Sequence, residues 1–130
     1  MTDNFEWLPI EALLELHAEQ LEEHGGAPGL RDRGGLESAV MRPQQILGYE
    51  PDTTVFRLAG AYAFGLTQNH PFIDGNKRAA LIAAGTFLAM NGWYLDATEQ
   101  ETVKIMLGLS SKEVSEADFC AWLESRSVQI

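Results

Sequence analysis

The sequence predicts an all-α fold, a compact domain of about six helices with one short β-pair as a minor addition. Three observations lead to this prediction. Apolar residues recur at helical spacing in several windows. Residues that typically start or end helices border these windows. The length of 130 residues and the hydrophobic content of 45% fit one hydrophobic core, so residues 1–130 are expected to form a single domain.

The first helix is expected to begin at Pro9, because proline is favoured in the first turn of a helix. One stripe of side chains follows at helical spacing, until two glycines end it: Ile10, Leu13, Leu14, His17 and Leu21. A histidine within an apolar stripe indicates packing, and His24 lies where a helix C-terminus favours it. Neither histidine is expected to be catalytic.

A surface loop and a short second helix are predicted next. Residues 27–35 are rich in glycine and alternating charges, which is typical of an ordered loop. Leu36, Ala39 and Val40 then begin a helix, and Pro43 is expected to end or bend it.

Two buried helices form the expected centre of the domain. Asp52 or Thr53 is predicted to cap the third helix, whose residues 55–66 are apolar on nearly every side. Residues 75–90 predict a long helix rich in alanine and leucine, and the following Asn-Gly pair suits its C-terminus.

The last two helices carry their own start signals. Thr98 and Glu101 have the spacing of a capping box, and Ser115 is expected to cap the final helix. The apolar residues of that helix are Phe119, Trp122 and Leu123. The minor β-pair is predicted to join residues 4–8 to Trp93–Leu95.

Charge and composition narrow the classes of partner. The net charge of −10 and the pI near 4.6 oppose the attraction that non-specific nucleic-acid binding needs, so no direct nucleic-acid partner is expected. Cys120 is the single cysteine, which excludes an intrachain disulfide and indicates a small buried side chain. No segment has the apolar length of a membrane span or the pattern of a signal peptide. A cytoplasmic protein without a membrane partner is therefore expected.

The segment from Asn69 to Leu81, NHPFIDGNKRAAL, places an anion-handling set of residues at the start of an apolar helix. A helix N-terminus presents free N–H groups and the positive end of its dipole, which favours phosphate. Gly75 allows close approach of the backbone to a ligand, and Lys77 and Arg78 add positive charge. These residues predict a phosphate-binding site.

Two further residues of this segment are candidates for catalysis. The Asp74 carboxylate is expected to hold a Mg²⁺ ion that also binds phosphate oxygens. His70 is the candidate general base, since a histidine titrates near neutral pH and can accept the proton of an attacking alcohol. Either residue alone could simply belong to a well-capped helix start with no catalytic role. The two together favour a catalytic site.

This segment resembles the signature of the Fic/Doc family, His-x-Phe-x-Asp/Glu-Gly/Ala-Asn followed by a small residue or Lys and then Arg. The resemblance implies that Phe72 is the buried aromatic that anchors the loop, and that Asn76, Lys77 and Arg78 handle phosphate. The stretch from Gly29 to Gln44, GLRDRGGLESAVMRPQ, is similar to one found in the death-on-curing branch of that family. The family's compact helical domain agrees with the predicted helix order.

The resemblance also implies a reaction and partners. Lys77 stands at a glycine position of the Fic proteins that transfer AMP, and Leu81 stands where they have a second arginine. Both match the death-on-curing branch, which implies a toxin that transfers the γ-phosphate of ATP to a Ser or Thr hydroxyl, with elongation factor Tu as the family's known type of target. No segment fits the inhibitory motif Ser/Thr-x-x-x-Glu-Gly/Asn, which implies a separate antitoxin.

Three hypotheses stay open at this stage. The first is the toxin kinase, with ATP and Mg²⁺; the second is transfer of AMP to a protein hydroxyl. The third is a catalytically idle domain that binds an antitoxin. The cluster of Arg31, Asp32 and Arg33 is equally open, since it either braces its loop or flanks a target-binding groove.

Overall fold

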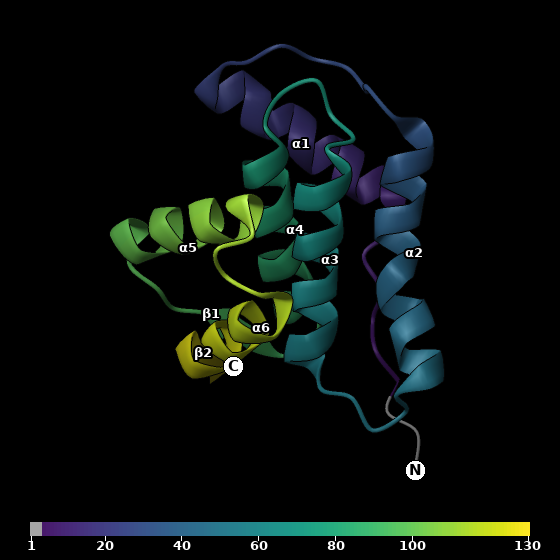
Figure 1. The fold of residues 1–130 in the computed structure, drawn as a ribbon, viewed down its shortest axis with the longest axis vertical. Coiled ribbons are helices and arrows are strands. Elements are labelled where there is room, and N and C mark those ends of the chain that lie inside the picture. The colour runs from purple at the N-terminus through teal and green to yellow at the C-terminus, as the bar shows by residue number, and fades with distance from the viewer. Residues whose placement is uncertain (1–3) are drawn as a thin grey trace.

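A computed structural model describes residues 4–130, in which six helices form the body of the molecule and a short two-stranded sheet lies at one end of it (Figure 1). The all-α prediction is confirmed. In chain order the elements are α1 (Ile10–His24), α2 (Arg33–Tyr49), α3 (Val55–Asn69), α4 (Asn76–Met90), β1 (Trp93–Leu95), α5 (Glu99–Ser111), α6 (Glu116–Arg126) and β2 (Ser127–Gln129).

Helices α3 and α4 stand side by side in the middle of the molecule (Figure 1). Helix α2 packs on one flank of α3, and α6 packs on another. Helix α1 crosses the end of the molecule where α3 leads into α4 (Figure 1). The Tyr62 ring of α3 is fully buried, and its hydroxyl accepts a hydrogen bond from the Leu8 N–H at 3.1 Å. The all-round apolar character of α3 thus reflects its central position, as predicted.

Helix starts follow the predicted caps with one correction. The capping box of Thr98 and Glu101 is formed, and the Ser115 hydroxyl caps α6. The cap of α3 is Thr54, so the prediction of Asp52 or Thr53 is wrong. Thr54 has the extended backbone of a cap, and its hydroxyl accepts from the N–H three residues on, which the two preceding residues are too far back to reach.

Helix α2 is longer than predicted at both ends. It begins at Arg33 because the Asp32 carboxylate accepts the Gly35 N–H at 2.9 Å, so the expected loop ends earlier. Pro43 lies inside the helix and does not end it. The proline ring is buried, and Ile46 one turn later is buried too; this packing offsets the hydrogen bond that proline cannot make.

A β-pair exists, but its predicted partner is wrong. Strand β1 pairs antiparallel with β2, with Tyr94 opposite Val128. The N-terminal segment instead meets the side chain of Asn91, which accepts the Glu6 N–H at 2.9 Å and donates to the Glu6 carbonyl at 3.0 Å. One amide side chain therefore satisfies the backbone groups that a strand would have paired.

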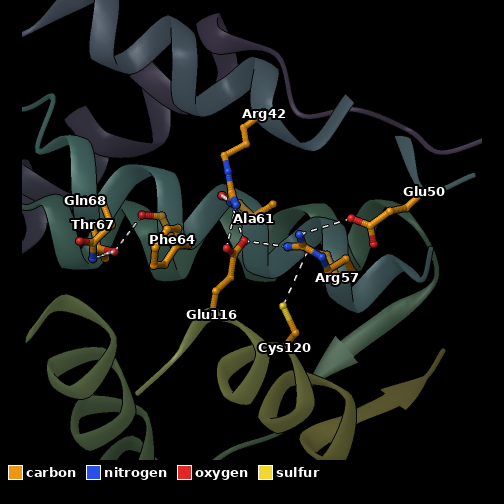
Figure 2. Close-up of polar contacts among 9 residues, drawn as sticks. All are labelled: Arg42, Glu50, Arg57, Ala61, Phe64, Thr67, Gln68, Glu116 and Cys120. Carbon is orange, nitrogen blue, oxygen red and sulfur yellow. Dashed lines mark hydrogen bonds and ion pairs between the residues drawn. The ribbon is translucent and has the colours of Figure 1, made fainter. Parts of the chain in front are cut away.

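An ion-pair network joins α2, α3 and α6 (Figure 2). The Glu116 carboxylate accepts hydrogen bonds from the guanidinium groups of Arg42 at 2.7 Å and Arg57 at 2.8 Å. Next to this network lies Cys120, which is buried as predicted. No helix within residues 4–130 has the length and apolar character needed to cross a membrane.

Candidate active site

The candidate site is the turn that connects α3 to α4. His70 forms the C-cap of α3, with φ 49° and ψ 54°, and its N–H donates to the Leu66 carbonyl at 3.2 Å. This left-handed conformation is unfavourable for a residue with a side chain, so other contacts must hold it. It turns the chain sharply and leaves the His70 side chain exposed.

Phe72 anchors the turn in the core. Its side chain is 1% exposed, and its ring stacks on the ring of His17, with centroids 3.7 Å apart and planes 12° apart. The Nε2 atom of His17 lies 2.8 Å from the Asp74 carbonyl. Since a carbonyl only accepts, Nε2 carries a proton there. His17 is packed, as predicted, but its second role in holding the Asp74 peptide is one that helical spacing alone does not reveal.

Asn76 links the two halves of the turn. Its Oδ1 accepts the Phe72 N–H and its Nδ2 donates to the Phe72 carbonyl, both at 2.9 Å. These two bonds fix the orientation of the amide, so the Nδ2 that lies 3.1 Å from Nδ1 of His70 must be a donor. Nδ1 therefore accepts, and the neutral His70 ring carries its proton on Nε2.

The start of α4 is open to an anion. Helices α2, α3, α5 and α6 each have a side-chain cap, whereas α1 and α4 have none; Gly75 caps α4 through its backbone alone, at φ 79°. The side chains of Lys77 and Arg78 are exposed, and neither forms an ion pair within residues 4–130. A pocket of about 350 Å³ opens here, between α4 and α5. Its lining residues are Asp74 to Arg78, Leu81, Thr102, Val103, Met106 and Leu107.

The structure thus brings the predicted phosphate residues to one pocket. His70 does not line this pocket and reaches it only through its hydrogen bond to Asn76. The pocket has a cationic side at the start of α4 and an apolar side on α5, to which Leu81 also belongs. This shape suits a ligand with a charged and an apolar part.

Asp74 is the carboxylate closest to this helix start. Its Oδ1 accepts the Gly75 N–H at 2.8 Å, and its Oδ2 accepts the Ala27 N–H at 3.3 Å. The side chain is exposed and keeps free lone pairs. Within residues 4–130 no group of three or more potential metal ligands exists. A single carboxylate fits Mg²⁺, which typically keeps several waters and takes its other ligands from substrate phosphates.

The connection between α1 and α2 braces the turn from outside (Figure 1). Nε of Arg31 donates to the His70 carbonyl at 2.8 Å, and Nη2 donates to the Asn69 carbonyl at 2.9 Å. The Ile73 N–H donates to the Gly29 carbonyl at 3.1 Å. Arg31 thus braces the α3–α4 turn through backbone carbonyls, whereas Arg33 forms a local ion pair with Glu37 at 3.6 Å. The resemblance of the Gly29–Gln44 stretch to the death-on-curing branch points to the other role, beside a target-binding groove.

Comparisons with known proteins show the family to which this chain belongs. Residues 7–88 match the Fic/DOC family. The chain is 33% identical over 105 residues to the protein kinase doc of Escherichia phage P1. The aligned region covers 81% of this chain and 82% of that protein. It is 43% identical over 74 residues to the toxin Doc of Mycolicibacterium smegmatis, which covers 56% and 57% of the two chains. Because the family match spans both the brace and the turn, the chain belongs to the Fic/Doc family.

Proposed function

We propose that this protein is the toxin of a toxin–antitoxin pair and that it transfers the γ-phosphate of ATP to a hydroxyl group of a target protein. The observation that carries the proposal is the open, cationic start of α4 beside the bonded pair of Asn76 and His70. The names of the two relatives, a protein kinase and a toxin, support the same reaction and the same biological role.

In this proposal the start of α4 holds the phosphates of ATP. Its first-turn N–H groups point out of the helix, and Lys77 and Arg78 add two charges without ion-pair partners among residues 4–130. The apolar wall on α5 gives the rest of the nucleotide a place to pack.

Asp74 is the residue that would hold Mg²⁺. The bound ion would neutralise phosphate charge that builds up during transfer. The protein prepares the carboxylate for this role from two sides, since the Ala27 and Gly75 N–H groups orient it and His17 holds its peptide.

His70 is the general base of the proposed reaction. The target hydroxyl oxygen attacks the γ-phosphorus, its proton passes to the imidazole, and the bond to the β-phosphate oxygen breaks, so that ADP leaves. In the structure the unprotonated nitrogen is Nδ1, which Asn76 occupies. Either the ring rotates or the proton moves from Nε2 to Nδ1, and both routes require the Asn76 bond to open.

Two positions favour phosphate transfer over AMP transfer. Lys77 adds a bulky cation at the second position of α4, where AMP-transferring relatives have glycine. Leu81 lines the pocket with an apolar side chain where those relatives have an arginine. With charge gathered at the helix start and absent one turn later, we infer that the terminal phosphate lies at the reacting position.

The target and the antitoxin belong to the same proposal. We take elongation factor Tu as the first target to test, since the resemblance to the death-on-curing branch implies it. We include an antitoxin in the proposal because one relative is named a toxin, and a toxin must be inhibited by a partner in the cell that makes it.

The test uses ATP labelled separately at the α- and γ-phosphate, with Mg²⁺ and either elongation factor Tu or a cytosolic extract. Transfer of γ-label that is lost in His70→Ala and kept in His24→Ala supports the proposal. His24 is a suitable control because its side chain is exposed at the C-terminus of α1 and pairs only with the neighbouring Glu23 among residues 4–130. Transfer of α-label would show AMP transfer and contradict the proposed phosphate transfer. If no protein acquires label that depends on His70, the protein would act as a binding domain without this catalysis.

A further inference from the structure

We infer that Arg31 is a positioning residue for His70, acting through the backbone conformation of the proposed base. This inference rests on the proposed role of His70 in phosphate transfer. Arg31 does not line the pocket at the start of α4, so its action on the reaction would pass through His70 alone.

The guanidinium group of Arg31 holds the two peptide groups that flank His70. The Asn69 carbonyl belongs to the peptide before His70, and the His70 carbonyl belongs to the peptide after it. Nη2 and Nε of Arg31 donate to these carbonyls at 2.9 and 2.8 Å. The orientations of these two peptides set φ and ψ of His70, so one planar fork holds both angles.

Two further bonds extend this hold along the chain. The backbone N–H groups of Arg31 and Asp32 both donate to the Pro71 carbonyl, at 2.7 and 3.0 Å. Three consecutive carbonyls, those of residues 69 to 71, thus accept hydrogen bonds from two consecutive residues. They lie at the C-terminus of α3, where carbonyls lack helical partners and where a cation is favoured.

The conformation held in this way is one that His70 would not adopt unaided. Its φ of 49° is left-handed, and in residues 4–130 the only other non-glycine residue with positive φ is Lys112. This conformation brings Nδ1 within 3.1 Å of Asn76. Without the fork, the turn is expected to relax and the ring to leave Asn76, which would disorder the base while the pocket residues stay in place.

Substitution of Arg31 tests this inference against a close control. Arg33 is suitable because it lies two residues away, is exposed, and has Glu37 at 3.6 Å as its ion-pair partner. We expect Arg31→Ala to lower kcat on the order of 100-fold, the typical effect of a misplaced catalytic group. KM for ATP should stay within about twofold, since uniform binding is kept. Arg31→Lys should recover little, because an ammonium group cannot form the two-pronged contact.

A second readout does not depend on activity. The chain has three histidines, so ¹⁵N-histidine spectra are simple to assign, with His70→Ala identifying the His70 ring. In alkaline buffer the native ring should show a proton on Nε2 and a hydrogen-bonded Nδ1. Arg31→Ala should lose this signature, while Arg33→Ala and the ring of His17 should keep theirs.

The two readouts separate failure of this inference from failure of the proposed function. If the native protein has no transfer activity, the proposed function is wrong. The ¹⁵N spectrum of His70 in Arg31→Ala would still test whether Arg31 positions this side chain. A native His70 spectrum in Arg31→Ala would overturn the inference, whatever the rate. So would an unchanged kcat. If Arg31→Ala does not fold, Arg31→Gln, which keeps one donor group, is measured in its place and judged by the same outcomes.

Discussion

Asn76 shows how much of the site depends on one amide. Its side chain is buried and bonds to the backbone of Phe72 on one side and to the ring of His70 on the other. The same residue therefore closes the turn and selects the tautomer of the proposed base. Stability and catalysis are coupled at this position, and a substitution should change both.

Asn76→Ala is expected to lower the free energy of unfolding by about 2–4 kcal/mol, because the buried N–H and carbonyl of Phe72 lose their partner. Phosphate transfer should fall with it, because the turn that carries His70 loses the two hydrogen bonds that close it. Urea unfolding and the γ-label assay measure the two effects. The matched control is Asn69→Ala at the end of α3, whose Nδ2 has the Gly35 carbonyl as its partner at 2.9 Å. Equal stability of Asn76→Ala and the native protein would contradict the assigned bonds.

At the scale of elements, close helix contacts depend on glycine. A Cβ at Gly60 on α3 would overlap Sγ of Cys120 on α6, and a Cβ at Gly65 would lie 3.1 Å from Ala39 on α2. The two glycines thus let α2 and α6 approach the central helix. Since α3 also carries His70 at its end, this packing places the proposed base relative to the rest of the molecule.

Gly60→Ala should destabilise the protein by about 1–3 kcal/mol through this overlap. Adding Cys120→Ala removes the sulfur, so the double variant should be more stable than the sum of the two single changes predicts. Gly85→Ala on α4 is the control: nothing lies within 4 Å of its added Cβ, and the change should stabilise by up to about 1 kcal/mol. Thermal and urea unfolding measure all four variants, and strict additivity would contradict the close contact.

The helices and the core of the turn could be predicted from sequence because their signals are local. Caps such as Ser115 depend on residues within a few positions, and the burial of Phe72 is implied by the family signature around it. The brace could not be predicted in the same way, since Arg31 and His70 meet only after α2 and α3 have packed. The second role of His17 has the same cause: its partner Asp74 lies 57 residues away.

The errors have local physical reasons of a different kind. Adjacent residues 52 to 54 all have side chains that can cap a helix, and only the start of α3 decides that Thr54 does so. Pro43 has a strong tendency to end helices, which its burial inside α2 overrides. The partner of β1 is a three-residue strand at the far end of the chain, too short for its pattern to be distinguished.

For the whole molecule, the network around Glu116 is the main polar connection between α2, α3 and α6 (Figure 2). The Glu116 side chain is 17% exposed and faces two guanidinium groups. Glu50 lies 3.6 Å from Arg57 but is more exposed and screened by solvent. Glu116 is therefore the partner that keeps two partly buried cations together.

Glu116→Gln is expected to lower the free energy of unfolding by about 1–3 kcal/mol, because Arg42 and Arg57 would face each other without a carboxylate between them. Because Arg42 and Arg57 are partly exposed, the loss of unfolding free energy should be smaller than for a fully buried ion pair. Glu124→Gln, an exposed change on the same helix with no ion pair in residues 4–130, should have almost no effect. Urea unfolding at low and high salt measures both; equal stabilities would contradict the role of the network.

Two buried acids at the centre of the molecule predict a loss of stability in alkali. Burial, followed by the nearby Glu116 carboxylate, raises the pKa of the Cys120 thiol from 9.0 to about 11. Burial raises the pKa of Tyr62 from 10.0 to about 12. A folded-state pKa above the unfolded one means that the folded state holds its proton more tightly. The resulting stability is fully present below pH 9.0 and is lost as the pH rises through these folded pKa values.

The free energy of unfolding should thus decline from about pH 9 upward, first through Cys120 and then through Tyr62. Cys120→Ala should be less stable than the native protein at neutral pH, where it loses buried packing, yet decline less between about pH 9 and 11. Tyr62→Phe should flatten the later part of the decline, above about pH 10. Urea unfolding across this range tests both, with Glu124→Gln as a variant that should keep the native slope. A decline that is parallel in all four proteins would show that neither buried acid is responsible, and that the loss of lysine charge in this strongly negative chain, which leaves its carboxylates less compensated, governs its alkaline stability.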